Sequence, residues 1–169
     1  MAKWQDIKGP VVADTVYSDN VLVAKDVAFT LPAMEFITAD VQAMGNMSVP
    51  LIGLMENMEL AITKVGLDAG LSRMLRMQKQ NLEFRWVQNV VKSDGSTGVE
   101  GCKAFVRTMP GTAPEIGVEV GSAPEMETTY NVSRVQIYAN GVEVCCVDRL
   151  ACILRFNGVD YYSKIRNLL

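Results

Sequence analysis

The chain has 169 residues, of which 49% are hydrophobic and 21% charged, and its formal net charge is −3. This length and composition predict one folded domain over residues 1–169 with a sizeable core, and they argue against a disordered chain. The sequence contains no histidine, which removes the commonest general base and the usual zinc ligand, and its small negative charge argues against a dedicated nucleic-acid binder. We therefore expect a protein that is not an enzyme, with no catalytic, cofactor-binding or metal-binding residues.

The cysteines have no metal-ligand or redox spacing. Cys102, Cys145, Cys146 and Cys152 form no Cys-x-x-Cys pair, so they are interpreted as small buried residues of a protein made in a reducing cell. The first residues hold no apolar segment of the length of a signal peptide, and no uncharged stretch is long enough to span a bilayer. Synthesis in the cytoplasm without a membrane anchor is the expectation.

Four segments in the first half of the chain alternate apolar and polar residues, which is the pattern of a β-strand with one buried face. They cover residues 27–31, 37–43, 58–63 and 82–87. In the second segment Ile37, Ala39 and Val41 alternate with polar residues, and Pro32 ends the first. This part of the chain is predicted to form antiparallel sheet.

One stretch has helical spacing instead. Asp68 is a good N-cap, and Leu71, Met74 and Leu75 recur on one helical face. The pattern predicts a single amphipathic helix over residues 69–80. Beyond the strand at 82–87, residues 92–101 are polar and glycine-rich and predict a solvent loop, while residues 110–128 carry four glutamates without a basic residue and predict an acidic, partly extended excursion.

The last third of the chain carries the strongest local signals. The apolar residues change parity at Ser133–Arg134, which predicts a β-bulge, and Asn140–Gly141 between alternating runs predicts a type I′ turn. Alternation resumes up to a second Asn-Gly pair at Asn157–Gly158. The whole pattern predicts a mainly β protein with one helix: an antiparallel two-sheet β-barrel or sandwich with a flanking α-helix.

Residues 41–57, VQAMGNMSVPLIGLMEN, are apolar in side chain but flexible in backbone. We expect a loop over residues 45–57. Because loops normally lie in water, its apolar side chains must pack either on their own domain or against a neighbouring subunit. The same two alternatives apply to the end of the chain, where Tyr162, Ile165 and Leu169 fall near one helical face, since a terminal segment frays unless it is docked.

Two long stretches carry a family resemblance. Residues 27–66, VAFTLPAMEFITADVQAMGNMSVPLIGLMENMELAITKVG, resemble the first half of the major tail tube proteins of contractile-tailed bacteriophages. Residues 130–169, YNVSRVQIYANGVEVCCVDRLACILRFNGVDYYSKIRNLL, are similar to the closing pattern of that family: a hairpin, a strand, Asn-Gly-Val-Asp and a basic tail. The resemblance begins near Val21, and residues 92–128 and the first twenty residues depart from it.

The resemblance implies the tail-tube fold, which is shared with R-type bacteriocins and with type VI secretion tubes. It implies hexameric rings that stack into a hollow tube within a contractile sheath, for passage of DNA or puncture of a membrane. The implied partners are copies of the chain itself, a sheath protein, a baseplate or tube initiator and a tape-measure protein, with DNA present only in transit. The chain would be made in the bacterial cytoplasm and end in a phage tail or a tail-like particle.

The resemblance also implies roles for segments and residues. Residues 1–20 would form an N-terminal arm, residues 45–57 an inter-subunit loop and residues 157–169 a C-terminal docking tail aimed by the Asn157–Gly158 turn. Glutamates that repel phosphate would suit a lumen that passes DNA, and Glu59, Glu115 and Glu119 are the candidates. The expected subunit-interface residues are Met44, Met47, Val49, Pro50, Leu51, Ile52, Leu54, Met55, Asn157, Gly158, Val159, Asp160, Tyr162, Ile165 and Leu169.

Two other functions compete with a tube subunit. A small β-barrel could bind an apolar ligand or peptide beside the methionine-rich segment. A carboxylate enzyme could use a pair such as Asp40 and Glu59, but the sequence offers no motif that joins them.

Overall fold

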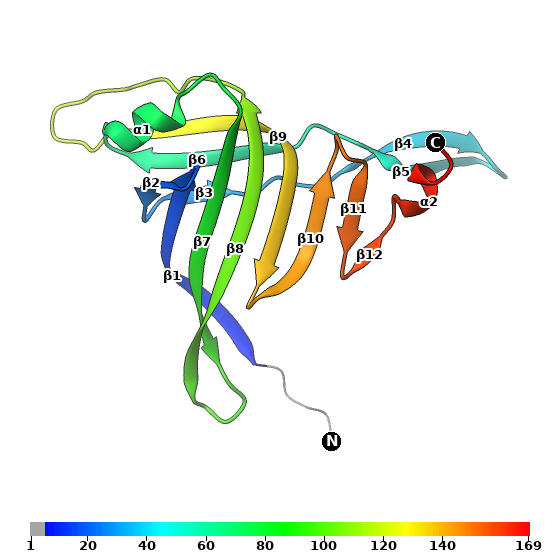
Figure 1. Cartoon of the computed structure of the whole chain (residues 1–169), viewed down its shortest axis with the longest axis horizontal. Coiled ribbons are helices and arrows are strands. Elements are labelled where there is room, and N and C mark those ends of the chain that lie inside the picture. The colour runs from blue at the N-terminus through cyan, green and yellow to red at the C-terminus, as the bar shows by residue number, and fades with distance from the viewer. Residues whose placement is uncertain (1–5) are drawn as a thin grey trace.

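The computed structural model describes residues 6–169 and consists mainly of β-strands (Figure 1). It contains twelve strands and two short helices over these residues. Their bounds are β1 Ile7–Ser18, β2 Val21–Lys25, β3 Ala28–Thr30, β4 Phe36–Gln42, β5 Asn46–Met55, β6 Glu59–Val65, α1 Ala69–Met74, β7 Gln80–Val91, β8 Thr97–Pro110, β9 Glu125–Ala139, β10 Val142–Asp148, β11 Ile153–Phe156, β12 Val159–Asp160 and α2 Ser163–Arg166.

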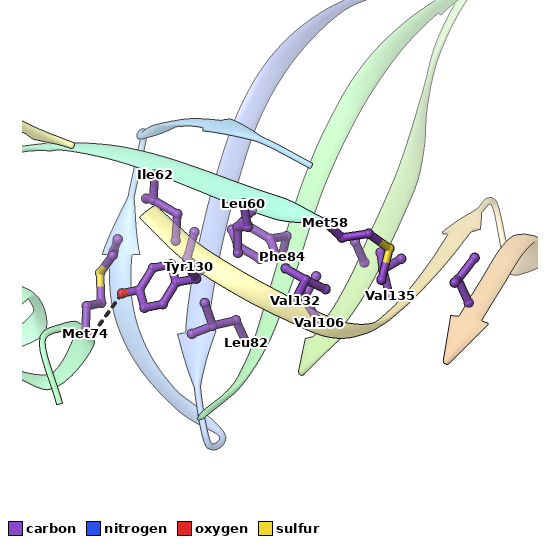
Figure 2. Close-up of a cluster of buried hydrophobic side chains, with 14 of the residues drawn as sticks. Met58, Leu60, Ile62, Met74, Leu82, Phe84, Val106, Tyr130, Val132 and Val135 are labelled. Carbon is purple, nitrogen blue, oxygen red and sulfur yellow. Dashed lines mark hydrogen bonds between the residues drawn. The ribbon is translucent and has the colours of Figure 1, made fainter. Parts of the chain in front are cut away.

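Ten of the strands form one sheet, in which every pair is antiparallel. The main path runs β12-β11-β10-β9-β8-β7-β1-β2, and β6 adds to β9 with β3 on its far side. β9 has 15 residues, and one of its edges pairs with two strands in succession: the first half pairs with β6 and the second half with β10. β6 and the first half of β9 therefore cross over β1, β7 and β8 as a second layer (Figure 2).

A β-bulge lies at the bend of β9, as predicted. Arg134 lies opposite Arg107 and Val132 opposite Thr108, which leaves Ser133 as the extra residue. Val132 and Ser133 are both buried, so the inward parity changes at this point. A bulge increases the local twist, and here it coincides with the change from one strand partner to the next.

The core lies between the two layers (Figure 2). β6 and β9 contribute Leu60 and Tyr130 from one side, and β7 and β8 contribute Phe84 and Val106 from the other. Buried apolar area of this kind stabilises the fold by roughly 25 cal/mol per Å². The Tyr130 hydroxyl donates a hydrogen bond of 2.8 Å to the carbonyl oxygen of Met74, and burial raises its pKa. Side chains thus fill the space between the layers.

The sheet is open, so the barrel named in the predicted barrel or sandwich is not closed in the single chain. β2 and β12 lie at its two ends in the described part of the chain, and the pairing of β6 with β9 gives two layers without closure. β4 and β5 form a separate two-stranded sheet that projects from the main body (Figure 1). The mainly β character and the packing of α1 beside the sheet agree with the prediction.

The helices differ from the single long helix that was expected. α1 has six residues and ends at Met74, although residues 69–80 carry a helical pattern. The reason is Gln80, whose buried amide nitrogen donates to the carbonyl oxygens of Met74 (3.0 Å) and Arg76 (2.9 Å). That side chain satisfies the carbonyl of the last helical residue, Met74, and that of Arg76 just beyond the helix, and β7 begins at the same residue. A second helix, α2, has four residues near the end of the chain.

The predicted turns and loops have mixed outcomes. Both Asn-Gly pairs have positive φ at both residues, about 48° at Asn140 and 79° at Gly141, with the same values at Asn157 and Gly158, as a type I′ turn requires. The loop at 92–101 is shorter than expected, because β8 begins at Thr97. Residues 111–124 have no regular strand or helix and are mostly exposed, in agreement with the predicted acidic excursion.

Candidate functional site: apolar segments at one end of the molecule

The segment expected as a loop over residues 45–57 is instead mostly a strand. β5 pairs with β4 in a register that places Met47 opposite Val41 and Val49 opposite Ala39. Met44 and Gly45, with φ of 51° and 127°, form the turn between the strands. Pro50 is tolerated because a two-stranded sheet consists only of edge strands, where a missing N–H need not break a ladder. The flexible composition was therefore a sign of a hairpin.

This hairpin exposes apolar side chains. Met44 is fully exposed, and Met47, Ile52 and Leu54 are each exposed by at least half of their surface. Val49 and Leu51 are half-buried and Pro50 is exposed. Two further exposed residues on β4, Ile37 and Val41, were not among the predicted contacts, although their alternation could have identified them. Met55 is the exception among the predicted residues, since it is 7% exposed and belongs to the core of its own chain.

The C-terminal segment packs on the hairpin of the same chain. A Cβ atom placed on Gly53 would lie 3.4 Å from the Tyr162 ring and 3.5 Å from Cδ1 of Ile165. The absence of a side chain at Gly53 lets α2 approach the strand, as the two elements do in Figure 1. Tyr162 is half-buried, whereas Ile165 retains 39% exposure and Leu169 is almost fully exposed. The sequence left open whether this segment packs on its own domain or against a neighbouring subunit. Tyr162 packs on its own domain, whereas Ile165 and Leu169 are exposed and free to contact a neighbour.

Asp160 holds the course of the chain after the Asn157–Gly158 turn. Its carboxylate accepts hydrogen bonds from the Tyr162 amide (3.0 Å) and the Arg166 guanidinium (2.9 Å). Burial works to raise the pKa of Asp160, but Arg166 and the backbone amides outweigh it, so the pKa is lowered. The carboxylate is thus charged at neutral pH and fixes the start of α2. Val159, on the edge strand β12, is 55% exposed.

A cavity of about 340 Å³ lies between the hairpin, the β10–β11 turn and Tyr162. Ile37, Leu54 and Ile153 line it with Asp148 and Cys152 among others. A larger hollow of about 490 Å³ lies on the outer face of the main sheet, over β7, β8 and β9. Neither is an enclosed interior of a barrel, so the structure gives no support to a barrel that holds an apolar ligand.

The three glutamates proposed for a lumen are not brought together. Glu59 begins β6 and accepts a hydrogen bond of 3.0 Å from Asn57, while Glu115 and Glu119 lie in segment 111–124. The carboxylates considered for an enzyme, Asp40 and Glu59, lie in different sheets.

The outer face of the main sheet carries charges that sequence reasoning did not single out. Arg107 and Arg134 lie opposite each other, and both approach the buried carboxylate of Asp148, at 3.8 and 3.9 Å. Arg85 pairs with Glu83 at 2.6 Å on the same face. The alternation in β7, β8 and β9 could have placed these residues together once the pairing was known.

The N-terminal arm and the cysteines can also be placed. Residues 7–18 of the expected arm form β1 within the main sheet, and residues 1–5 lie outside the described residues. Cys102, Cys145 and Cys146 are buried and Cys152 is exposed, all as free thiols. Among residues 6–169, His, Cys, Asp and Glu form no group arranged to hold a metal ion, and no helix has the length and apolar character needed to cross a membrane.

Comparisons with known proteins identify the family. The family model of phage tail tube protein FII matches residues 11–169. A search of curated proteins gave no match. Two solved chains share the fold, both from cryo-EM structures of PVC, an extracellular contractile injection system, in the extended state. One, from its sheath-tube complex, superposes with a TM-score of 0.51 at 12% identity, over 78% of this chain and 91% of that chain.

The second, from the PVC sheath/tube terminator, superposes with a TM-score of 0.51 at 13% identity, over 76% of this chain and 95% of that chain. At these identities the structural likeness establishes a common fold. The family match establishes the family as well as the fold, because the model covers all but the first ten residues of the sequence. The chain therefore belongs to the phage tail tube protein FII family, and it is a structural subunit of a tail tube and not an enzyme.

Proposed function

We propose that the chain builds the inner tube of a contractile injection machine, as hexameric rings that stack into a hollow tube within a sheath. The observation that carries the proposal is the projecting β4–β5 hairpin, on which Met44, Met47, Ile52 and Leu54 are exposed in a member of a tube-forming family. The PVC chains of the same fold belong to a sheath-tube complex and a sheath/tube terminator, which supports a sheath as partner.

Assembly follows from two kinds of heterologous contact. A head-to-tail lateral contact closes after six copies if the rotation is suitable, whereas the axial contact between rings does not close and so extends the tube. Burial of the exposed apolar side chains on the hairpin and on α2 would stabilise these contacts by roughly 25 cal/mol per Å², less the cost of association and ordering. Among the predicted interface residues Met55 is buried, and the others are exposed or half-buried in the single chain.

An open sheet in the single chain suits this proposal. In a ring, the sheets of neighbouring copies would join around the lumen, so that closure into a barrel is a property of the assembly. Glu59, Glu115 and Glu119 remain candidates for the lumen, where carboxylates would keep DNA phosphates from binding. A tube initiator or baseplate would nucleate the first ring, and a tape-measure protein would occupy the lumen and set tube length.

The particle is a phage tail or a tail-like device such as a bacteriocin, assembled from chains made in the bacterial cytoplasm. The sheath pushes the tube toward the target envelope, and the tube itself performs no chemistry. DNA passes without specific binding in an infectious particle.

Electron microscopy tests the proposal directly. Purified protein, alone at rising concentration and together with its baseplate, is expected to form rings or hollow rods of uniform width. Persistent monomers under every nucleating condition would contradict the proposal. Native mass spectrometry that found a stoichiometric small molecule and no self-association would favour a binding module instead.

A further inference from the structure

A second group of exposed apolar residues lies at the end of the molecule opposite the hairpin. In segment 111–124, Val118 and Val120 are 79% and 103% exposed, and Ile116 is 45% exposed. Val65 and Leu67, in the connection from β6 to α1, are also more than half exposed. The hydrogen bond of 3.0 Å from the Gly66 amide to the Pro124 carbonyl oxygen places this connection beside the end of the segment. We call residues 111–124 with Val65 and Leu67 the acidic end.

Segment 111–124 has the pattern of a strand without a strand partner. Ile116, Val118 and Val120 alternate with Glu115 and Glu119, yet no strand of residues 6–169 pairs with them. The segment is anchored where it leaves the sheet, by a hydrogen bond of 3.2 Å from Thr112 to the carbonyl oxygen of Thr129. Its middle therefore presents apolar side chains that the chain itself does not cover, which marks an interaction surface.

Segment 111–124 carries charge opposite to that of two basic residues at the hairpin end. Residues 110–128 contain four glutamates and no basic residue, and none of the four forms an ion pair within the described chain. Arg73 and Lys79 lie beside this end, on and after α1, so the charge argument concerns the segment itself. At the opposite end, Arg149 and Lys164 have no carboxylate partner over residues 6–169, whereas Arg166 is paired with Asp160. Glu35, Asp40 and Glu56, on and beside the hairpin, are exposed and also form no ion pair over these residues, so the positive charge of this end is confined to Arg149 and Lys164.

These two ends cannot meet within one chain. Figure 1 places α1 and the segment between β8 and β9 at one extreme of the longest axis, and β4, β5 and α2 at the other. We propose that the acidic end receives the hairpin end of a neighbouring copy, where the hairpin end is β4, β5 and α2 together with Arg149. The inference rests on the proposed function, since it needs copies that assemble, and it names the surface that the exposed hairpin contacts.

The contact joins apolar side chains to apolar side chains, with charges at its border. Ile116, Val118 and Val120 cover the exposed side of the hairpin, and Glu115 and Glu119 lie within reach of Lys164 and Arg149 of the neighbour. This contact takes Glu115 and Glu119 away from the lumen and leaves Glu59 as the lumen candidate. Charge complementarity of this kind selects the register and orientation of a contact more than it adds affinity. Because the two surfaces differ, the contact is heterologous and propagates from copy to copy.

A charge exchange between the two ends tests the contact. The full-length chain is prepared as the acidic-end variant Glu115→Lys/Glu119→Lys, as the hairpin-end variant Arg149→Glu/Lys164→Glu, and with all four changes. Each single-end variant is expected to raise the protein concentration needed for assembly about tenfold at low salt, because two exposed ion pairs become repulsive. The variant with all four changes is expected to assemble at a concentration close to that of the wild type. Circular dichroism checks that each variant is folded.

A cross-link then locates the contact. In a Cys152→Ser background, Val118→Cys together with Met47→Cys is expected to give a ladder of covalent oligomers when assembled protein is oxidised. The matched control replaces Val118→Cys with Val142→Cys, which is 69% exposed at the β9–β10 turn, and should give no ladder.

The outcomes separate the two proposals. If the wild type forms tubes but the variant with all four changes assembles no better than the single-end variants, or the ladder arises from Val142→Cys and not from Val118→Cys, the inference is overturned while the tube function stands. If the wild type forms neither rings nor rods with any nucleus, the function itself fails, and the inference fails with it.

Discussion

Lys64 and Gly70 show how individual residues hold α1 on the sheet. Lys64 is 6% exposed, and its ammonium donates a hydrogen bond of 3.0 Å to the carbonyl oxygen of Val23 and pairs with Asp68, the N-cap. The hydrogen bond from Lys64 lowers the pKa of Asp68, and the amide of Leu71 adds to the effect. The carboxylate is therefore charged at neutral pH, where it can both cap the helix and neutralise the buried lysine.

Gly70→Ala should destabilise the fold although alanine favours helix. A Cβ at this position would lie 2.0 Å from the Val23 carbonyl oxygen, a backbone atom that cannot move without displacing β2. We expect a loss of about 2 kcal/mol in the free energy of unfolding, measured by urea denaturation, because overpacking outweighs the gain in helix propensity of about 1 kcal/mol. Gly101→Ala is the control, since nothing lies within 4 Å of its Cβ position. Equal stability of the two variants would show that the contact is not tight.

The hairpin and α2 act together as one element pair. Gly53 brings β5 close to Tyr162 and Ile165, and Asp160 directs the chain toward that contact. Neither piece is stable alone, since an isolated two-stranded hairpin is marginal in water and a four-residue helix is far below the length of an independent one. The contact between them therefore decides whether the hairpin is presented in one conformation.

Tyr162→Ala should loosen this contact, whereas Tyr161→Ala should not. The Tyr162 ring packs against Gly53 and is more buried than the Tyr161 ring, which is 50% exposed. Amide hydrogen exchange over residues 159–168 is expected to accelerate about tenfold in Tyr162→Ala, corresponding to about 1.4 kcal/mol of local opening. If both tyrosine variants exchange at the wild-type rate, α2 is held by other contacts.

At the scale of the molecule, folding and assembly use different surfaces. The core between the two layers contains Phe84, Leu60 and Val106 at full burial, and it is complete in the single chain. Two groups of exposed apolar residues lie outside it, on the hairpin and at the acidic end, among others elsewhere on the surface. A chain arranged in this way can fold first and assemble afterwards, because the contacts that stabilise the monomer are not the ones that join copies.

Ile52→Lys/Leu54→Lys should separate the two processes. Both side chains are more than half exposed in the monomer, so the free energy of unfolding should change by no more than about 0.5 kcal/mol. Tube formation, followed by sedimentation and electron microscopy, should be lost because two charges enter the proposed apolar interface. Val142→Lys serves as the control for an added exposed charge. Normal tubes from the double variant would show that the hairpin does not take part in the interface.

Local signals in the sequence predicted the features that depend on a few neighbouring residues. The β-bulge at Ser133, the two Asn-Gly turns, the Asp68 cap and most strands follow from parity, turn chemistry and capping. β1 was missed because residues 7–18 do not alternate regularly, and its place beside β7 comes from pairing at long range. The end of α1 was misplaced because Gln80, which terminates it, acts through a side chain that folds back on the helix.

The sequence predicted which residues form the candidate site but not the secondary structure that they adopt. Methionine, glycine and proline in residues 44–55 indicated an adaptable apolar segment, but glycine and proline are equally frequent in loops and in hairpin turns. Only the pairing of Met47 with Val41 shows that the segment is a strand. Likewise, the exposed alternation in residues 115–120 had no meaning until the sheet was known to leave it unpaired.

By itself the sequence determined the mainly β class, the positions of the tight turns and, through two long family-like stretches, membership among tail tube proteins. The class and the turns are local or additive along the chain, so periodicity and turn chemistry carry them, whereas the family rests on the resemblance of the two stretches. The tertiary structure alone decided that the sheet stays open, that α2 packs on Gly53 and that the hairpin and the acidic segment lie at opposite ends of the molecule. Those features depend on which distant strands pair, and many pairings are compatible with the same alternation of apolar and polar residues.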